Sequence, residues 1–261
     1  DPNATNFNMC LRTDGTLWMW GNNPDGNLGV NDTSQRSSPT QIPGTTWSTA
    51  FTHGGGGGGV KTDGTLWIWG NNSNGYLGQN NTTQYSSPKQ IPGTTWKQGA
   101  GMGYGVAATK TDGTMWSWGD NSQGALGLNS RTEYSSPVQI PGTTWNKVFS
   151  NGLGGEALKT DGTMWTWGVN ELGQLGQNDV VYRSSPTQIP GTTWSVIGKG
   201  GGGGGSTSMA IKTDGTMWAW GRNDNGAGGL NNTTVLSSPV QVPGTTWEAV
   251  MNNQASAGLK A

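Results

Sequence analysis

The sequence is built from five copies of one segment, each marked by the tetrapeptide Thr-Asp-Gly-Thr. Successive tetrapeptides begin 49, 49, 49 and 53 residues apart. They start at Thr13, Thr62, Thr111, Thr160 and Thr213. Repeats of this length with several short strands are typical of propeller blades, because one small sheet buries its faces only against its neighbours. The chain shows no apolar period of 3.6 residues, which excludes a helical solenoid.

Each copy contains signals for about four short strands. In the first copy, Asp14-Gly15 lies between two β-prone stretches and predicts a two-residue hairpin turn with positive φ values. Side chains alternate along the following LWMW segment, so Trp18 and Trp20 share one face and both faces are apolar. The segments SSPTQI and TTWSTA, separated by the turn pair Pro43-Gly44, predict two more strands. We therefore expect an all-β protein, a β-propeller of four-stranded repeats.

We expect one repeat domain over residues 1–261, with five copies that form either a closed five-blade ring or an arc of a larger propeller. The copies span approximately 6–53, 54–102, 103–151, 152–204 and 205–254, and a partial sixth strand spans 255–261. Three tryptophans per copy account for all 15 in the chain. Burying one indole removes about 200 Å² from water, so this regular spacing indicates core residues and not ligand-stacking ones.

Composition and charge exclude several classes of partner. Only 11% of the residues are charged and the net charge is −1, so we expect no nucleic-acid partner. No apolar run is long enough to cross a bilayer and the first residues lack a signal peptide, so we expect a soluble chain without membrane insertion. The single cysteine, Cys10, allows no intrachain disulfide and is interpreted as a small packing residue.

No pattern in the sequence supports catalysis, a cofactor or a metal site. The only histidine, His53, has no nucleophile elbow near it. The repeated aspartates are explained as caps of their own turns, and the loop with Asp25 and Asp32 lacks the closing glutamate of a calcium loop. The glycine runs 54–59 and 200–205 lack a phosphate-loop ending, and they indicate either close backbone packing or loosely ordered segments. We predict that the protein is not an enzyme and binds no small molecule.

The repeats resemble a known family. The segment KTDGTMWTWGVNELGQLG from Lys159 to Gly176, followed by SSPTQI, is similar to repeats of the regulator of chromosome condensation family, in a bacterial or phage-like variant. The resemblance covers all five copies and implies a propeller, which has seven blades in that family. Two features depart from the family pattern: the chain has five copies, and glycine-rich segments stand where a Gly-x-x-His pattern usually lies.

The copies differ most in the loops, where we place candidate interaction residues. Tyrosine and arginine dominate interface hot spots, and loops on a rigid scaffold are common recognition sites. Neutral drift on solvated loops is the alternative explanation for this variation. The candidates are Arg36, Tyr76, Tyr85, Arg131, Tyr134, Tyr182, Arg183 and Leu236.

Three functions fit these observations to different degrees. We favour a non-enzymatic structural or adhesive propeller, either virion-associated or extracellular, that has a protein partner or assembles with itself. The alternative is a soluble partner-binding propeller, such as a secreted inhibitor or a signalling regulator. The resemblance also implies guanine-nucleotide exchange on a small GTPase, which would need a basic tail and an acidic, specific face that the sequence lacks.

Overall fold

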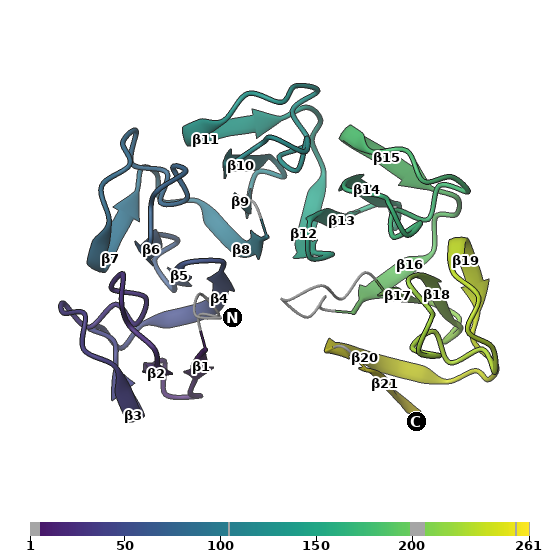
Figure 1. Cartoon of the computed structure of the whole chain (residues 1–261), viewed down its shortest axis with the longest axis horizontal. Helices are drawn as coiled ribbons and strands as arrows, with labels where there is room; N and C mark the ends of the chain where they lie inside the picture. Colours follow the sequence, from purple (N-terminus) through teal and green to yellow (C-terminus); the bar gives the residue numbers. More distant parts are fainter. Residues whose placement is uncertain (1–5, 104, 199–206, 254, 261) are drawn as a thin grey trace. The chain divides into compact units, whose positions relative to one another are not determined.

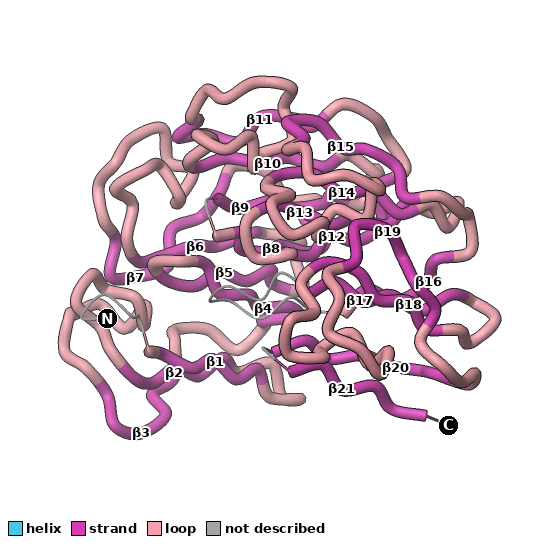
Figure 2. The backbone as a smooth tube through the Cα atoms, turned by 45° about the vertical axis from the view of Figure 1, so that its right-hand side comes forward, coloured by secondary structure: helices cyan, strands magenta, loops and turns pink. Residues whose placement is uncertain are grey.

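The structure is a computed structural model that describes residues 6–103, 105–198, 207–253 and 255–260, with the backbone alone for 250–260. These residues form strands, turns and loops and contain no helix (Figure 2). The predicted all-β fold class is therefore confirmed. No helix in these ranges is long and apolar enough to span a bilayer.

The chain divides into two compact units, of which the first consists of Asp1–Gly101, Gly105–Asn121 and Glu133–Thr143. The first sheet has the order β1 (Phe7–Leu11), β2 (Leu17–Gly21), β3 (Arg36–Gln41) (Figure 1). The second has the order β4 (Trp47–His53), β5 (Gly56–Lys61), β6 (Leu66–Gly70), β7 (Tyr85–Ile91). The third has the order β8 (Trp96–Met102), β9 (Gly105–Lys110), β10 (Met115–Gly119), β11 (Tyr134–Ile140).

The second unit consists of Met102–Tyr104, Ser122–Thr132 and Thr144–Ala261. One sheet has the order β12 (Trp145–Ser150), β13 (Gly154–Lys159), β14 (Met164–Gly168), β15 (Arg183–Ile189). The next has the order β16 (Trp194–Ile197), β17 (Thr207–Lys212), β18 (Met217–Gly221), β19 (Leu236–Gln241). The last pairs β20 (Trp247–Asn253) with β21 (Ala255–Lys260). Each four-stranded sheet thus contains four strands in chain order.

The strand that carries two tryptophans is covered on both faces, as its sequence predicts. In β6, Leu66 and Ile68 are fully buried on one face, and Trp69 is fully buried on the other. Trp67 is half-buried beside Trp69. The corresponding second tryptophans of the next three repeats, Trp118, Trp167 and Trp220, are also fully buried. These second tryptophans are therefore core residues, whereas the first tryptophan of each repeat is half-buried.

The Asp-Gly turn differs in detail from the predicted two-residue hairpin turn. Arg12 donates its N–H to the carbonyl of Thr16, and Gly15 donates to the carbonyl of Arg12, so three residues form the turn. Gly15 has a φ of +79°, whereas Asp14 is not among the residues with positive φ. A type I turn followed by one left-handed residue has this geometry, and only the glycine needs the left-handed conformation.

The first glycine run forms strand β5, where the absence of side chains permits close packing. A Cβ atom on Gly56 would lie 2.1 Å from the carbonyl oxygen of Trp69, and one on Gly58 would lie 2.4 Å from the ring of Phe51. Of the two alternatives for this run, close backbone packing is therefore correct. The second run, 200–205, lies outside the described residues.

The prediction that Cys10 is a packing residue is wrong. Cys10 is exposed, whereas residues at the same position of later repeats, such as Ala108 and Ala157, are fully buried. In those repeats another strand pairs with the far edge of the corresponding strand, but β1 lies at the edge of its three-stranded sheet. The side chain at position 10 consequently lacks the neighbouring strand that covers its counterparts.

Candidate functional site

Two sets of connections project from opposite ends of the strands in each repeat. We call one the loop end, which is the long loop after the second tryptophan, covering 22–35, 71–84, 120–133, 169–182 and 222–235. We call the other the turn end, formed by the Thr-Asp-Gly-Thr and Pro-Gly-Thr-Thr turns. Antiparallel strand pairing places these two ends apart in every sheet.

A buried asparagine organises the loop end. In the fourth repeat, Asn170 is fully buried and donates its side-chain N–H groups to the backbone carbonyls of Asp179 and Val181, at 3.0 and 3.1 Å. Its side-chain oxygen accepts the backbone N–H of Leu175 at 2.9 Å. The equivalent bonds recur at Asn23, Asn72 and Asn223. These loops therefore have a fixed shape. Sequence reasoning missed this role, although the asparagine recurs three residues after each second tryptophan.

The loops also bond to the following repeat. In the first unit, Asn31 has a φ of +67° and donates its backbone N–H to the carbonyl of Ser86 at 2.7 Å. In the second unit, Asn129 makes the same bond to Ser184 at 2.7 Å. Asparagine tolerates this left-handed conformation better than most residues. The loop end is thus part of the packing between successive repeats as well as an exposed surface.

Four of the eight candidate loop residues have structural partners that explain their identity. Arg36 bonds to Asp32, and Arg183 bonds to Asp179, each at 2.5 Å and four residues apart. Arg36, Tyr85, Tyr134, Arg183 and Leu236 stand at the same aligned position of the five repeats. Where this position holds Tyr85 or Leu236, the residue four positions earlier is an asparagine. Tyr85 and Leu236 are half-buried and pack against hydrophobic clusters. Arginine at this position therefore occurs together with an aspartate four residues earlier, and Tyr85 and Leu236 occur together with an asparagine.

Of the other four candidates, only Arg131 is exposed, and the three tyrosines are half-buried. The backbone carbonyl of Tyr76 accepts the indole N–H of Trp118 at 2.8 Å, and its hydroxyl accepts a bond from Asn74 at 3.3 Å. Tyr182 donates its hydroxyl hydrogen to Glu171 in the same loop. Arg131 is exposed and Tyr134 is half-buried at the start of β11. The eight residues belong to five loops and the strands that follow them.

The turn end is exposed yet identical in all five copies. In the first copy, Asp14 Oδ1 accepts the backbone N–H and the hydroxyl of Thr16, at 3.0 and 2.6 Å. These bonds to Thr16 hold the pKa of Asp14 below its ordinary value, so the carboxylate is charged at neutral pH. The same pair of bonds occurs in the other four copies. The prediction that each aspartate caps its own turn is confirmed.

A lysine at the turn end lies against two indoles. Lys61 Nζ is 5.0 Å from the ring centre of Trp47 and 4.3 Å from that of Trp67. Lys110, Lys159 and Lys212 have equivalent positions in the next three repeats. Cation–π attraction holds each ammonium in a fixed place. The turn end therefore presents fixed charges of both signs.

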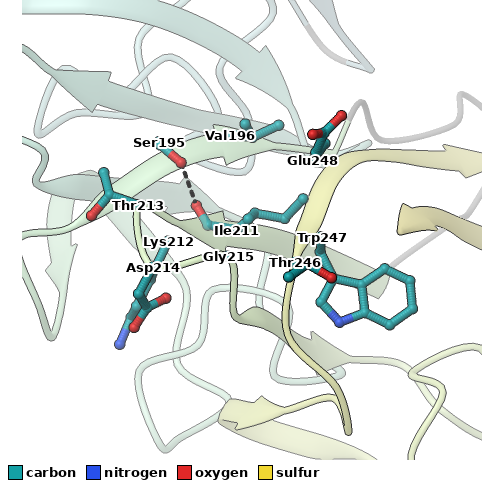
Figure 3. Close-up of a pocket in the computed structure, with 10 residues that line it drawn as sticks. All are labelled: Ser195, Val196, Ile211, Lys212, Thr213, Asp214, Gly215, Thr246, Trp247 and Glu248. Carbon is teal, nitrogen blue, oxygen red and sulfur yellow. Dashed lines mark hydrogen bonds between the residues drawn. The ribbon is translucent and has the colours of Figure 1, made fainter. Parts of the chain in front are cut away.

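A hollow of about 500 Å³ lies at the turn end of the second unit (Figure 3). Its lining includes Ser195, Lys212, Asp214, Trp247 and Glu248. The Ser195 hydroxyl donates to the carbonyl of Ile211 at 3.1 Å, as drawn in Figure 3. The lining residues include no histidine that would activate this serine. The hollow offers polar and charged side chains as contacts.

His53 is a buried structural residue of β4. Its Nδ1 accepts the N–H of Gly55 at 3.3 Å, and its Nε2 lies 3.1 Å from the carbonyl oxygen of Trp69, to which it donates in the neutral tautomer. Burial lowers the pKa of His53 to about 4. Within the described ranges, no group of three or more His, Cys, Asp or Glu side chains is placed to hold a metal ion.

Comparisons with known proteins agree with the repeat pattern. The family model described as the regulator of chromosome condensation (RCC1) repeat matches residues 14–56, 63–104, 112–155 and 161–207, and a second RCC1 repeat model matches 202–227. A search of curated proteins finds no sequence match.

Solved structures share the fold. Human WBSCR16 aligns with 98% of the chain at 20% identity and a TM-score of 0.82, with 70% of WBSCR16 covered. Yeast RCC1 (Prp20) bound to Kap60 aligns with 97% at 19% identity and 0.80, with 66% covered. Prp20p from Saccharomyces cerevisiae, described with its binding properties to Gsp1p and histones, aligns with 98% at 16% identity and 0.78, with 67% covered. These alignments show a β-propeller architecture.

Proposed function

Because the chain belongs to the RCC1 repeat family, we propose that it is a non-enzymatic β-propeller that binds a protein partner through the loop ends of its repeats. The observation that carries this proposal is the contrast inside each loop. A buried asparagine fixes the loop backbone, while the residues displayed around it differ from copy to copy. Fixed loops with variable side chains suit specific recognition, because little conformational freedom is lost on binding.

The chemistry of the loop end favours a protein over a small ligand. The candidate side chains include arginine and tyrosine on separate loops, which favours a broad contact area over one enclosed site. Kap60, Gsp1p and histones, the partners recorded for the Prp20 structures, are also proteins. Identities of 16–20% carry no particular partner from those structures to this chain.

A loop exchange within the chain tests the proposal. Residues 171–182 and 122–133 are both twelve-residue segments after the equivalent asparagine, so replacing the former by the latter, with Arg183→Tyr, changes the display while keeping Asn170. The control variant is Thr192→Ala with Thr193→Ala at the turn end. Proteins cross-linked to the wild type in an extract of the source organism would be identified, purified and titrated against all three chains.

We expect the loop exchange to weaken binding of the purified partner by at least about tenfold, and the turn-end control to bind as the wild type does. If all three chains bind equally, the other loops would be exchanged one at a time. Loss of binding in one of those exchanges would place the contact on that repeat. Binding that survives every loop exchange and is lost in the turn-end variant would refute the proposal.

A structural or adhesive role on a virion or cell surface is the second candidate. It is supported by the turn end, where exposed residues such as Pro43, Thr45 and Thr46 recur unchanged in every copy although packing does not require their side chains to be buried. A regular array of identical sites suits attachment to a repetitive surface. Immunogold labelling of particles and cells of the source organism would separate this role from that of a freely diffusing binding protein.

A further inference from the structure

One position in the second unit breaks the pattern of the repeats. Glu156 lies in the middle of β13 and is 1% exposed. The equivalent residues of the other four-stranded sheets are Gly58, Ala107 and Met209, none of which ionises. A carboxyl group in a site that is otherwise glycine or apolar costs stability when it is charged. Such departures from local consistency tend to mark functional or strained positions.

Glu156 faces groups that cannot neutralise a negative charge. Phe149 of β12 and Thr166 of β14 are its partners in the adjacent strands. Ser208 of β17, in the following repeat, is its side-chain hydrogen-bond partner, and this bond lowers the pKa of Glu156 by less than burial raises it. The Oε1 atom has no bond partner among the described residues. The lysines on the strands packed against Glu156 are held elsewhere, because Lys159 and Lys212 lie over tryptophan rings and Lys147 is exposed.

The single hydroxyl hydrogen of Ser208 has two possible acceptors, the carbonyl of Gln174 and the carboxylate of Glu156. The Ser208 hydroxyl donates to the backbone carbonyl of Gln174 at 3.2 Å. The same carbonyl accepts the indole N–H of Trp220 at 2.9 Å. A hydroxyl has one hydrogen, so while it donates to Gln174 it can bond to Glu156 only as an acceptor. In that arrangement the carboxyl group supplies the hydrogen and is protonated, whereas a hydroxyl turned towards Glu156 would donate to the carboxylate and give up its bond to Gln174.

We propose that Glu156 and Ser208 form a proton-dependent latch between the fourth and fifth repeats. With the carboxyl protonated, the chain of bonds runs from Glu156 to Ser208 and on to Gln174, which also holds Trp220. When the proton leaves to solvent, the carboxylate becomes an acceptor without a cation in a buried site. The contact between β13 and β17 then loosens so that water reaches the charge.

The pH range of the latch follows from the burial of the carboxyl group. Burial raises the pKa of Glu156 from 4.5 to about 7. Below pH 4.5 the group is protonated in both the folded and the unfolded chain, and its favourable contribution is fully present. As the pH rises to about 7 and beyond, the unfolded chain releases the proton more readily than the folded chain. Stability from this group is therefore lost on going from acid to alkaline pH.

Hydrogen exchange tests the latch directly. Exchange of the backbone amides in 154–159 and 207–212 would be followed at pH 6 and pH 8.5, with rates corrected for the intrinsic effect of pH. In the wild type we expect corrected rates at least about tenfold higher at pH 8.5. In Glu156→Gln, which keeps the size and stays uncharged, the two pH values should give equal corrected rates. Glu248→Gln, at an exposed position, is the matched control and should behave as the wild type.

A second variant covers the case in which glutamine disturbs folding. Glu156→Met places at this position the residue that occurs at Met209 in the next repeat, and it should also remove the pH effect. The proposal is overturned if the wild-type rates do not change between the two pH values, or if both variants retain the wild-type change. It is also overturned if Ser208→Ala leaves the exchange of 154–159 unaltered at pH 6.

Discussion

Trp167 donates its indole N–H to the backbone carbonyl of Ala125, which lies 42 residues earlier in the preceding repeat. The bond is 2.8 Å long and the ring is fully buried. The same link joins Trp69 to Asn27, Trp118 to Tyr76 and Trp220 to Gln174. The acceptor is a main-chain atom in every case, so the link itself does not depend on which side chain stands at that loop position. In four of the repeats, one tryptophan therefore fills the core and also ties its repeat to the one before.

Replacing Trp167 by phenylalanine keeps an aromatic ring but removes the N–H group. We expect the free energy of unfolding to fall by about 2–5 kcal/mol, from the smaller ring together with the unsatisfied carbonyl of Ala125. Trp165→Phe is the control, since the half-buried Trp165 bonds only to the hydroxyl of Thr163 two residues away. Urea denaturation should show the larger loss for Trp167. Equal losses would mean that the link to Ala125 contributes nothing beyond ring volume.

Phe51 and Gly58 should be energetically coupled, because they are partners in adjacent strands and the phenyl ring fills the space above the glycine. Gly58→Ala should cost about 1–3 kcal/mol and Phe51→Ala about 3 kcal/mol. The double variant recreates the pair Ala100 and Ala107 of the third repeat, so its cost should be at least about 1 kcal/mol below the sum.

Gly56→Ala provides the comparison for this cycle. Its Cβ would lie against the backbone oxygen of Trp69 and not against Phe51. The double variant Gly56→Ala with Phe51→Ala should therefore lose as much stability as the sum of its two single variants. Chemical denaturation of the five variants measures all these costs. Additive losses at positions 51 and 58 would show that the ring and the added methyl group do not compete for space.

His53 should make stability fall as the pH falls. Its pKa is about 4 in the folded protein against an ordinary value of 6.5, mainly because of burial. The unfolded chain therefore binds the proton first, and stability is lost as the pH drops from about 6.5 towards 4. Thermal melting at closely spaced pH values should show this loss in the wild type and a smaller one in His53→Gln. A histidine NMR titration with a midpoint near 6.5 would contradict the burial argument.

The Asp179–Arg183 pair predicts which exchanges the loop tolerates. Arg183→Leu alone leaves Asp179 without its cation, although for a partly exposed pair the loss should stay below about 1 kcal/mol. Adding Asp179→Asn recreates the Asn232 and Leu236 combination of the fifth repeat and should recover most of that loss. Thermal melting of the single and double variants at low salt measures the difference. A double variant less stable than Arg183→Leu would contradict the pairing.

Much of the fold follows from periodicity in the sequence. The alternation in LWMW and its equivalents predicts strands covered on both faces, and the structure buries Leu66, Ile68 and Trp69 accordingly. The sequence predicts the position of the Asp-Gly turn correctly, but the turn has three residues and not two. Asp-Gly also occurs in three-residue turns in which a single residue is left-handed. The exposure of Cys10 depends on which strand adjoins β1, and local pattern carries no information about that neighbour.

The candidate site was less predictable. Loop variation pointed to Arg36 and Tyr85, yet the ion pair with Asp32 and the packing of Tyr85 depend on distances that only the folded loop defines. The buried role of Asn170 was open to detection, since the residue recurs at a fixed offset from each second tryptophan. The sequence alone does not single out Glu156, because its unusual environment depends on burial and on a partner 52 residues away in the next repeat.

The asparagine at the base of each loop gives the repeats a modular character. Because Asn170 closes the loop through main-chain atoms, and because Arg183 follows the loop directly and pairs with Asp179 inside it, residues 170–183 together carry their own scaffold and their own charge balance. Recombination between copies within the gene would therefore move a loop from one blade to another as an intact cassette. New combinations of loop residues on the surface would then arise by recombination alone, with no further substitutions needed in the strands.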